Sequence, residues 1–156
     1  MDFVVRKIRT DEIEKVADFI SKGYFDDIYF HWVVDKPEDR HKVVMDYYIS
    51  YISARGSVVH VAEGADGGLV GASVWLPHDL DEAVSELVYK NAGIYAKNFK
   101  EVGRKSYHSC PPLEPFYELV AVVTAKQMQG RGIGAALLKY HLDILDKKGI
   151  PTYLEA

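Results

Sequence analysis

Cysteine is nearly absent from this sequence of 156 residues, because Cys110 is the only one. One cysteine cannot form an intramolecular disulfide, and it excludes a zinc site built from several thiolates. No residue near Cys110 in the sequence could activate its thiol, so we interpret it as non-catalytic. The histidines do not stand at metal-ligand spacings either, and we therefore expect no bound metal. The histidines compared are His31, His41, His60, His78 and His141.

Long apolar runs and an excess of positive charge are also missing. No stretch approaches the roughly 18 apolar residues of a membrane span. Asp2 and the run from Arg6 to Arg9 leave no apolar core for a signal peptide. Lys and Arg number 19 against 23 Asp and Glu, which gives a formal net charge of −4. These absences predict a soluble, cytoplasmic protein with no membrane and no nucleic-acid partner.

The length and the composition suit one globular domain. Hydrophobic residues make up 48% of the chain and charged residues 27%, which are ordinary values for a folded protein. No internal repeat, low-complexity tract or linker divides the chain. We therefore expect a single domain over residues 1–156.

The hydrophobic pattern predicts a mixture of strands and helices. We expect Thr10 to cap the first helix and Gly23 to end it, and Gly56 to end the second helix. The pattern predicts strands over residues 3–8, 57–62, 69–76, 117–123 and from 150 onward, and helical segments over residues 10–23, 37–56, 79–106 and 133–148.

Three glycines, Gly130, Gly132 and Gly134, follow the strand at 117–123, and the next helix begins within this run, near Ile133. A helix N-terminus exposes unpaired backbone N–H groups that carry partial positive charge. Glycine lets an anion approach these groups closely. The arrangement predicts a binding site for a phosphate or pyrophosphate.

Several known classes of phosphate-binding loop can be compared with this segment. The loop of nucleoside triphosphatases is excluded, because no Gly-Lys-Ser/Thr closes the run. A dinucleotide fingerprint fits Gly130, Gly132 and Ala135, with Glu155 as its acidic residue. However, residues 124–128 make a longer connection between strand and glycines than that fold uses.

A third interpretation is more specific, because the run from Gln129 to Gly134 has the pattern Q-x-x-G-x-G. This pattern resembles the cofactor signature of the GNAT acyl-CoA N-acyltransferases. The run from Gly149 to Glu155 resembles the segment after that signature in puromycin-acetyltransferase-like members. The resemblance implies an α/β GNAT fold, a mixed and mostly antiparallel sheet flanked by helices. Acetyl-CoA would bind where two parallel strands splay apart.

The resemblance also implies which residues hold acetyl-CoA. Backbone groups of Val122, Val123 and Thr124 would line the acetyl and pantetheine arm. A strand N–H near Val122 would polarise the acetyl carbonyl, and Gln129 would brace the loop. The pyrophosphate would be cradled by the backbone N–H groups of Gly130, Arg131, Gly132, Ile133, Gly134 and Ala135.

Acetyl transfer to an amine requires a base, because a primary amine with a pKa of about 10 is protonated at pH 7. Glu118, on the strand before the loop, and Glu155, at the end of the last strand, are the catalytic candidates. His108 is a third candidate. For each residue, an ordinary surface side chain is the alternative. Acidic residues between Tyr24 and Tyr51 would suit a cationic amine, namely Asp26, Asp27 and Asp46.

The sequence departs from the family pattern in two places. Thr124 and Lys126 stand where the family often has Val and Pro. The chain also ends at Ala156, where the family continues with a helix and two strands. We therefore expect either a C-terminally incomplete fragment of a longer protein or a fold completed by a second chain, as in a homodimer.

Together these features predict an acetyl-CoA-dependent N-acetyltransferase. The enzyme would transfer acetyl to the primary amine of a small-molecule substrate by direct attack, without a metal. The alternative is a non-catalytic CoA-binding module, a degenerate or truncated acyltransferase that acts as a sensor or partner subunit. Loss of acetyl in the presence of an amine would distinguish the enzyme from the module.

Overall fold

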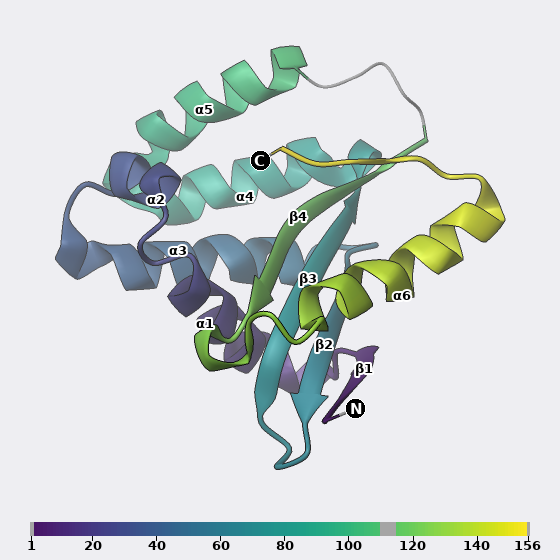
Figure 1. Cartoon of the computed structure of the whole chain (residues 1–156). Helices are drawn as coiled ribbons and strands as arrows, with labels where there is room; N and C mark the ends of the chain where they lie inside the picture. Colours follow the sequence, from purple (N-terminus) through teal and green to yellow (C-terminus); the bar gives the residue numbers. More distant parts are fainter. Residues whose placement is uncertain (1, 110–114, 156) are drawn as a thin grey trace.

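A single mixed sheet organises the chain, as the computed structural model of residues 2–109 and 115–155 shows (Figure 1). Cys110 lies outside the described residues. The strands are β1 (Phe3–Lys7), β2 (Val58–Gly64), β3 (Leu69–Pro77), β4 (Tyr117–Thr124) and β5 (Thr152–Tyr153). The helices are α1 (Ile13–Gly23), α2 (Ile28–Val33), α3 (Pro37–Ile52), α4 (Asp81–Ala92), α5 (Ala96–Ser109) and α6 (Ile133–Lys148). In this described part of the chain, no helix has the length and apolar character needed to span a bilayer.

The strands follow one another across the sheet in the order β1-β2-β3-β4-β5. The first three pairings are antiparallel, whereas β4 and β5 run parallel. The mixed, mostly antiparallel sheet is therefore confirmed. The parallel pairing is short, since it joins only Tyr117 to Thr152 and Glu118 to Tyr153. Beyond Glu118, β4 continues without β5 beside it.

A β-bulge lies in β4 at Val120. Its neighbours Leu119 and Ala121 are opposite consecutive residues of β3, so Val120 has no direct partner there. A bulge bends its strand and shifts the alternation of side chains between the two faces. After it, Ala121 packs under α1 to α5 while Val122 packs with α6.

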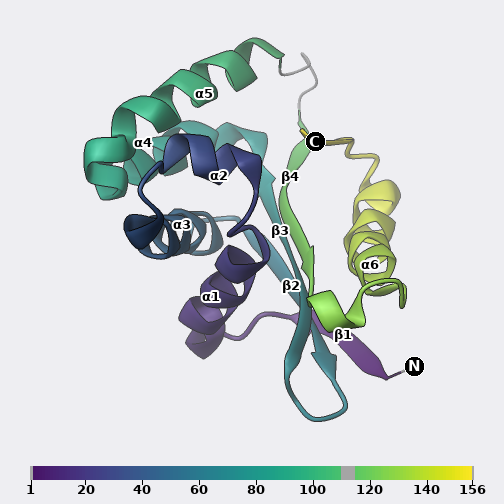
Figure 2. The same ribbon diagram turned by 60° about the vertical axis from the view of Figure 1, so that its left-hand side comes forward.

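The helices are divided unequally between the two faces of the sheet. Figure 2 shows α6 on one face and α1 to α5 on the other. The larger core draws on every helix of its face, through Val16, Phe30, Val44, Val88 and Phe99. The smaller core holds α6 to the sheet through Ala62, Val70, Ile133 and Leu137.

Most predicted elements are present, including the hairpin of β2 and β3, and the exceptions have local causes. Thr10 is not a cap, because it opens a 3-10 turn. The buried Glu12 instead accepts the Arg9 N–H at 2.9 Å. Helix α3 ends at Ile52, and Gly56 takes a positive φ in the turn that follows.

Two helices differ from the expected pattern. The sequence pattern did not resolve α2, a short helix whose start is capped by the Asp27 carboxylate, 2.9 Å from the Tyr29 N–H. Helix α5 runs through Ser109, so His108 lies on a helix and not in the predicted loop. The His108 side chain is outside the described part of the structure.

Candidate active site

The outer edge of β4 presents backbone groups at Val122. This residue lies opposite Ser73 of β3, yet its N–H and C=O both turn the other way. Both groups meet the Tyr24 hydroxyl, at N···O 3.3 Å and O···O 3.2 Å. Val122 is the residue whose N–H was expected to polarise the acetyl carbonyl. In this structure that N–H already has a partner, which sequence reasoning missed.

Tyr24 reaches the edge because the end of α1 lies against β4. The residue follows Gly23 directly, and a Cβ on Gly23 would come within 2.4 Å of Val123 Cγ1. The ring of Tyr24 stacks on Tyr48, with centroids 5.7 Å apart. Burial raises the pKa of the Tyr24 phenol, so the hydroxyl keeps its proton at neutral pH.

The N-terminus of α6 offers backbone donors without a side-chain cap. Gly130 and Gly132 have φ values of 77° and 82°, a region that glycine enters at little cost. No side chain caps the helix start. The Ala136 N–H bonds to the Gly132 C=O, so the N–H groups from Ile133 to Ala135 precede that bond and point outward.

The glycine-rich loop and the end of β4 are close to each other. The Gln129 side-chain amide lies 3.5 Å from the Thr124 carbonyl oxygen, which is the bracing geometry expected of Gln129. A Cβ on Gly134 would lie 3.7 Å from Thr124 Oγ1. The structure thus brings together the strand residues and the loop residues that the sequence assigned to one site. Those residues are Val122, Val123, Thr124, Gln129, Gly130, Arg131, Gly132, Ile133, Gly134 and Ala135.

Gly71 of β3 allows α6 to sit this close to the sheet. A Cβ there would come within 2.7 Å of Ile133 Cγ2 and 2.9 Å of Leu137 Cδ1. Sequence reasoning missed this residue. The available signal was a glycine inside a strand, which marks a close approach.

Two buried histidines lie farther along the contact between α6 and the sheet. His60 of β2 and His141 of α6 have ring centroids 5.2 Å apart. Nδ1 of His60 and both ring nitrogens of His141 are buried and have no hydrogen-bond partner in the described structure. Burial lowers the pKa of His60 to about 4, and it also lowers the pKa of His141.

Glu118 and Glu155 both lie near Tyr153, at the end of the short β5 pairing. Glu118 pairs in register with Tyr153, and the Tyr153 hydroxyl donates to Glu155 at 2.9 Å. Tyr117, the neighbour of Glu118, points to α6, since its ring lies 5.5 Å from that of His141. Glu118 therefore lies on the opposite face, which α1 to α5 cover. No sequence pattern pointed to Tyr153.

The acidic residues proposed for amine binding have local structural contacts. Asp27 caps α2, as described above. The Asp46 carboxylate lies 2.6 Å from Lys42 Nζ, one turn away on the same helix. The Asp26 side chain is 94% exposed and lies 3.9 Å from His31 Nε2. Each of the three acids thus has a local contact, and their role in amine binding stays a prediction.

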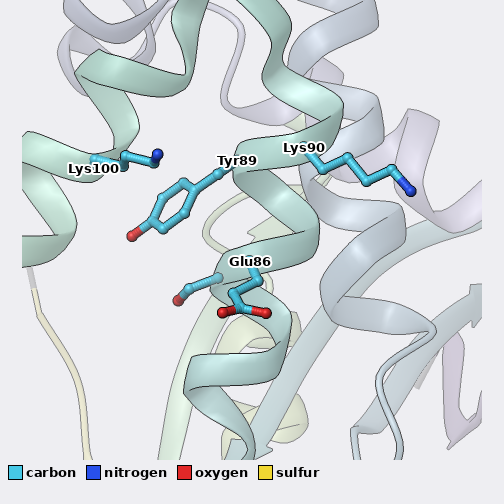
Figure 3. Close-up of a pocket in the computed structure, with 5 residues that line it drawn as sticks. Glu86, Tyr89, Lys90 and Lys100 are labelled. Atoms are coloured by element: carbon cyan, nitrogen blue, oxygen red, sulfur yellow. The ribbon is translucent and has the colours of Figure 1, made fainter.

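A cavity of about 590 Å³ lies between α4 and α5 (Figure 3). Its lining carries both signs of charge, with Glu86, Lys90 and Lys100 around Ser85 and Tyr89. Lys100 Nζ lies 5.5 Å from the centre of the Tyr89 ring, and Lys90 points to the other side of α4. The residues that line the cavity all fall within the predicted helical segment 79–106.

No group of three or more His, Cys, Asp or Glu side chains among residues 2–109 and 115–155 could hold a metal ion.

Comparisons with known proteins bear on this site. The sequence model described as "Acetyltransferase (GNAT) family" matches residues 25–156. No curated protein matches the sequence.

Solved acetyltransferase structures share the fold. A structure of histone acetyltransferase HPA2 and related acetyltransferase from Corynebacterium glutamicum superposes with a TM-score of 0.63 at 17% identity, over 93% of this chain and 72% of that one. Arylalkylamine N-acetyltransferase 2 from Aedes aegypti gives 0.68 at 14% identity, over 100% and 76%. Ribosomal-protein-alanine N-acetyltransferase from Brucella melitensis gives 0.55 at 12% identity, over 99% and 79%. At these identities the likeness establishes the fold, and it confirms the expected one.

Proposed function

This chain belongs to the acetyltransferase (GNAT) family, and we propose that it transfers acetyl from acetyl-CoA to the primary amine of a small molecule. One observation carries the proposal. A strand edge with outward N–H and C=O groups, at Val122, leads within a few residues to the uncapped, glycine-rich start of α6. The run from Gly149 to Glu155 supports a relationship to the puromycin-acetyltransferase-like members of the family.

The described residues fit the two chemically different parts of acetyl-CoA. Its pyrophosphate suits the outward N–H groups between Gly130 and Ala135, where the partial positive charge of the helix end adds attraction. Its amide-containing arm suits the edge of β4 at Val122 and Thr124, because an extended amide chain pairs with a strand edge as another strand would. When bound, acetyl-CoA supplies the activated acetyl group.

The proposed catalytic groups lie at the far end of the same edge. An uncharged amine attacks the acetyl carbonyl carbon, the new C–N bond forms, and the C–S bond breaks to release CoA. A backbone N–H at Val122 would stabilise the charge that develops on the carbonyl oxygen. Glu118 or Glu155 would take the proton from the amine, directly or through water.

The structure favours this interpretation over a dinucleotide site. A dinucleotide fold turns from strand to helix almost at once. Here a 3-10 turn, Lys126–Met128, stands between β4 and the glycines. The Gln129 contact with Thr124 belongs to this longer connection.

The test is acetyl transfer by the purified protein with a panel of primary amines. Release of free CoA thiol is followed with and without each amine. Thiol release that depends on an amine supports the proposed enzyme. Binding of acetyl-CoA without thiol release, for any amine class, supports the non-catalytic CoA-binding module. Absence of acetyl-CoA binding contradicts both.

A further inference from the structure

Tyr24 connects the end of α1 to the edge of β4 at the candidate acetyl-CoA site. Its hydroxyl accepts a hydrogen bond from the Val122 N–H and donates one to the Val122 C=O. A single phenol thus pairs both of the backbone groups that Val122 turns outward. The two residues are 98 positions apart in the sequence.

Packing holds the Tyr24 ring in this position. The ring stacks on Tyr48, with an interplanar angle of 26°, and meets the edge of Phe30 at 6.4 Å. The missing side chain at Gly23 brings the end of α1 against β4. Tyr24 itself is only half-buried, so its side chain is not fully enclosed by the protein.

An extended ligand on this edge would need the same two backbone groups. A strand edge binds an amide chain through its outward N–H and C=O groups, and at Val122 both already contact Tyr24. The Val122 N–H cannot form full-strength hydrogen bonds to the Tyr24 hydroxyl and to a ligand oxygen at the same time. Binding of the arm therefore requires the hydroxyl to leave.

We propose that Tyr24 is a displaceable partner of Val122, whose hydroxyl is replaced when the acyl-bearing amide arm of the ligand adds to β4. This inference rests on the proposed function and assigns Tyr24 a positioning role. The hydroxyl keeps the edge paired in the free protein and lowers the affinity for ligands that carry the arm. It leaves the affinity for the phosphate-bearing half of the ligand unchanged.

The test compares Tyr24→Phe with Tyr48→Phe as a matched control. Each variant loses one hydroxyl from the same stacked pair, but only Tyr24 contacts Val122. Calorimetry measures binding of acetyl-CoA and of 3′-phospho-ADP, which has the pyrophosphate and no amide arm. Exchange of the Val122 amide proton is measured by NMR in the ligand-free proteins.

Tyr24→Phe should bind acetyl-CoA about two- to tenfold more tightly, the range expected from one net hydrogen bond. Its affinity for 3′-phospho-ADP should not change, and its Val122 amide should exchange faster. Tyr48→Phe should alter neither the acetyl-CoA affinity nor the Val122 exchange. Equal or weaker acetyl-CoA binding by Tyr24→Phe overturns the inference.

A measurement on the wild-type protein covers the case in which a variant does not fold. The ring signals of Tyr24 should shift with acetyl-CoA and stay in place with 3′-phospho-ADP. If acetyl-CoA binds and the Tyr24 signals do not move, the inference is wrong while the proposed function stands. If neither ligand binds, the proposed function fails, and the inference fails with it.

Discussion

In the described part of the chain, one face of the sheet is covered by helix α6 and the other by α1 to α5. The α6 face contributes mainly backbone groups to the candidate site, at the glycine-rich loop and the first turn of α6. The α1–α5 face contributes side chains, among them Tyr24, Glu118 and the tyrosines around them. A site made of backbone groups depends on glycines that can adopt positive φ values. A site made of side chains depends on residues that the fold brings together from distant segments. The difference predicts that the two faces respond differently to substitution.

The largest effect is expected on the α1–α5 face. Glu118→Gln should lower the rate of acetyl transfer about 100-fold, because loss of a general base typically costs 10²–10⁴-fold. Acetyl-CoA affinity should not change, since the carboxylate is not part of the pyrophosphate loop. Steady-state kinetics and calorimetry measure the two quantities. Glu155→Gln is the companion variant, and full activity in both would remove the carboxylates from the mechanism.

The next effect tests how closely α6 packs. Gly71→Ala should lower the free energy of unfolding by about 2 kcal/mol, because the new Cβ would meet Ile133 and Leu137 at 2.7 and 2.9 Å. Gly134→Ala is the control within α6, where the new Cβ meets only Thr124 Oγ1 at 3.7 Å. That substitution should raise stability slightly. Urea unfolding of both variants makes the comparison, and a tolerated Gly71→Ala would contradict the tight contact.

The buried histidines make the α6 face sensitive to acid. The pKa of His60 is about 4 in the folded protein, below its ordinary value of 6.5. The unfolded chain therefore takes up the proton first as the pH falls. Stability should be complete above pH 6.5 and should decline as the pH falls from 6.5 towards 4. In His60→Met this side chain cannot take up a proton. The stability of the variant should therefore fall less as the pH is lowered. An unchanged pH slope in that variant would argue against the assignment.

The smallest effect tests the charge preference of the loop. Ala135→Glu places a carboxylate beside the outward N–H groups and should weaken acetyl-CoA binding about tenfold, in line with charge effects at helix ends. Ala135→Gln has nearly the same size without the charge and should bind close to normally. Equal affinities of the Glu and Gln variants would show that no anion binds there.

The difference between the two faces also explains which features the sequence could predict. The run from Gln129 to Ala135 lies between β4 and α6 and extends into the first turn of that helix. All its residues are neighbours in the sequence, so local spacing alone indicated a phosphate site. The sheet and the hairpin were also predictable, because their alternation and turn residues are local.

Other features depend on contacts between distant segments. The pairing of Tyr24 with Val122 joins positions 98 residues apart, and no periodicity predicts it. The approach of α6 to Gly71 has the same origin. Thr10 was misassigned because a capping threonine and a threonine inside a 3-10 turn have the same local sequence pattern. The hydrogen bond from the Arg9 N–H to the Glu12 carboxylate distinguishes the 3-10 turn from a threonine cap.

The central claim is that acetyl-CoA binds along the edge of β4 and the start of α6. Thermal unfolding of the purified chain with acetyl-CoA, CoA, NAD and ATP in parallel tests it most directly. A ligand that binds only the folded state, at about a hundred times its dissociation constant, adds roughly 2.7 kcal/mol of stability. We expect this stabilisation with acetyl-CoA and CoA and none with NAD. Stabilisation by NAD alone would contradict it and favour the dinucleotide interpretation.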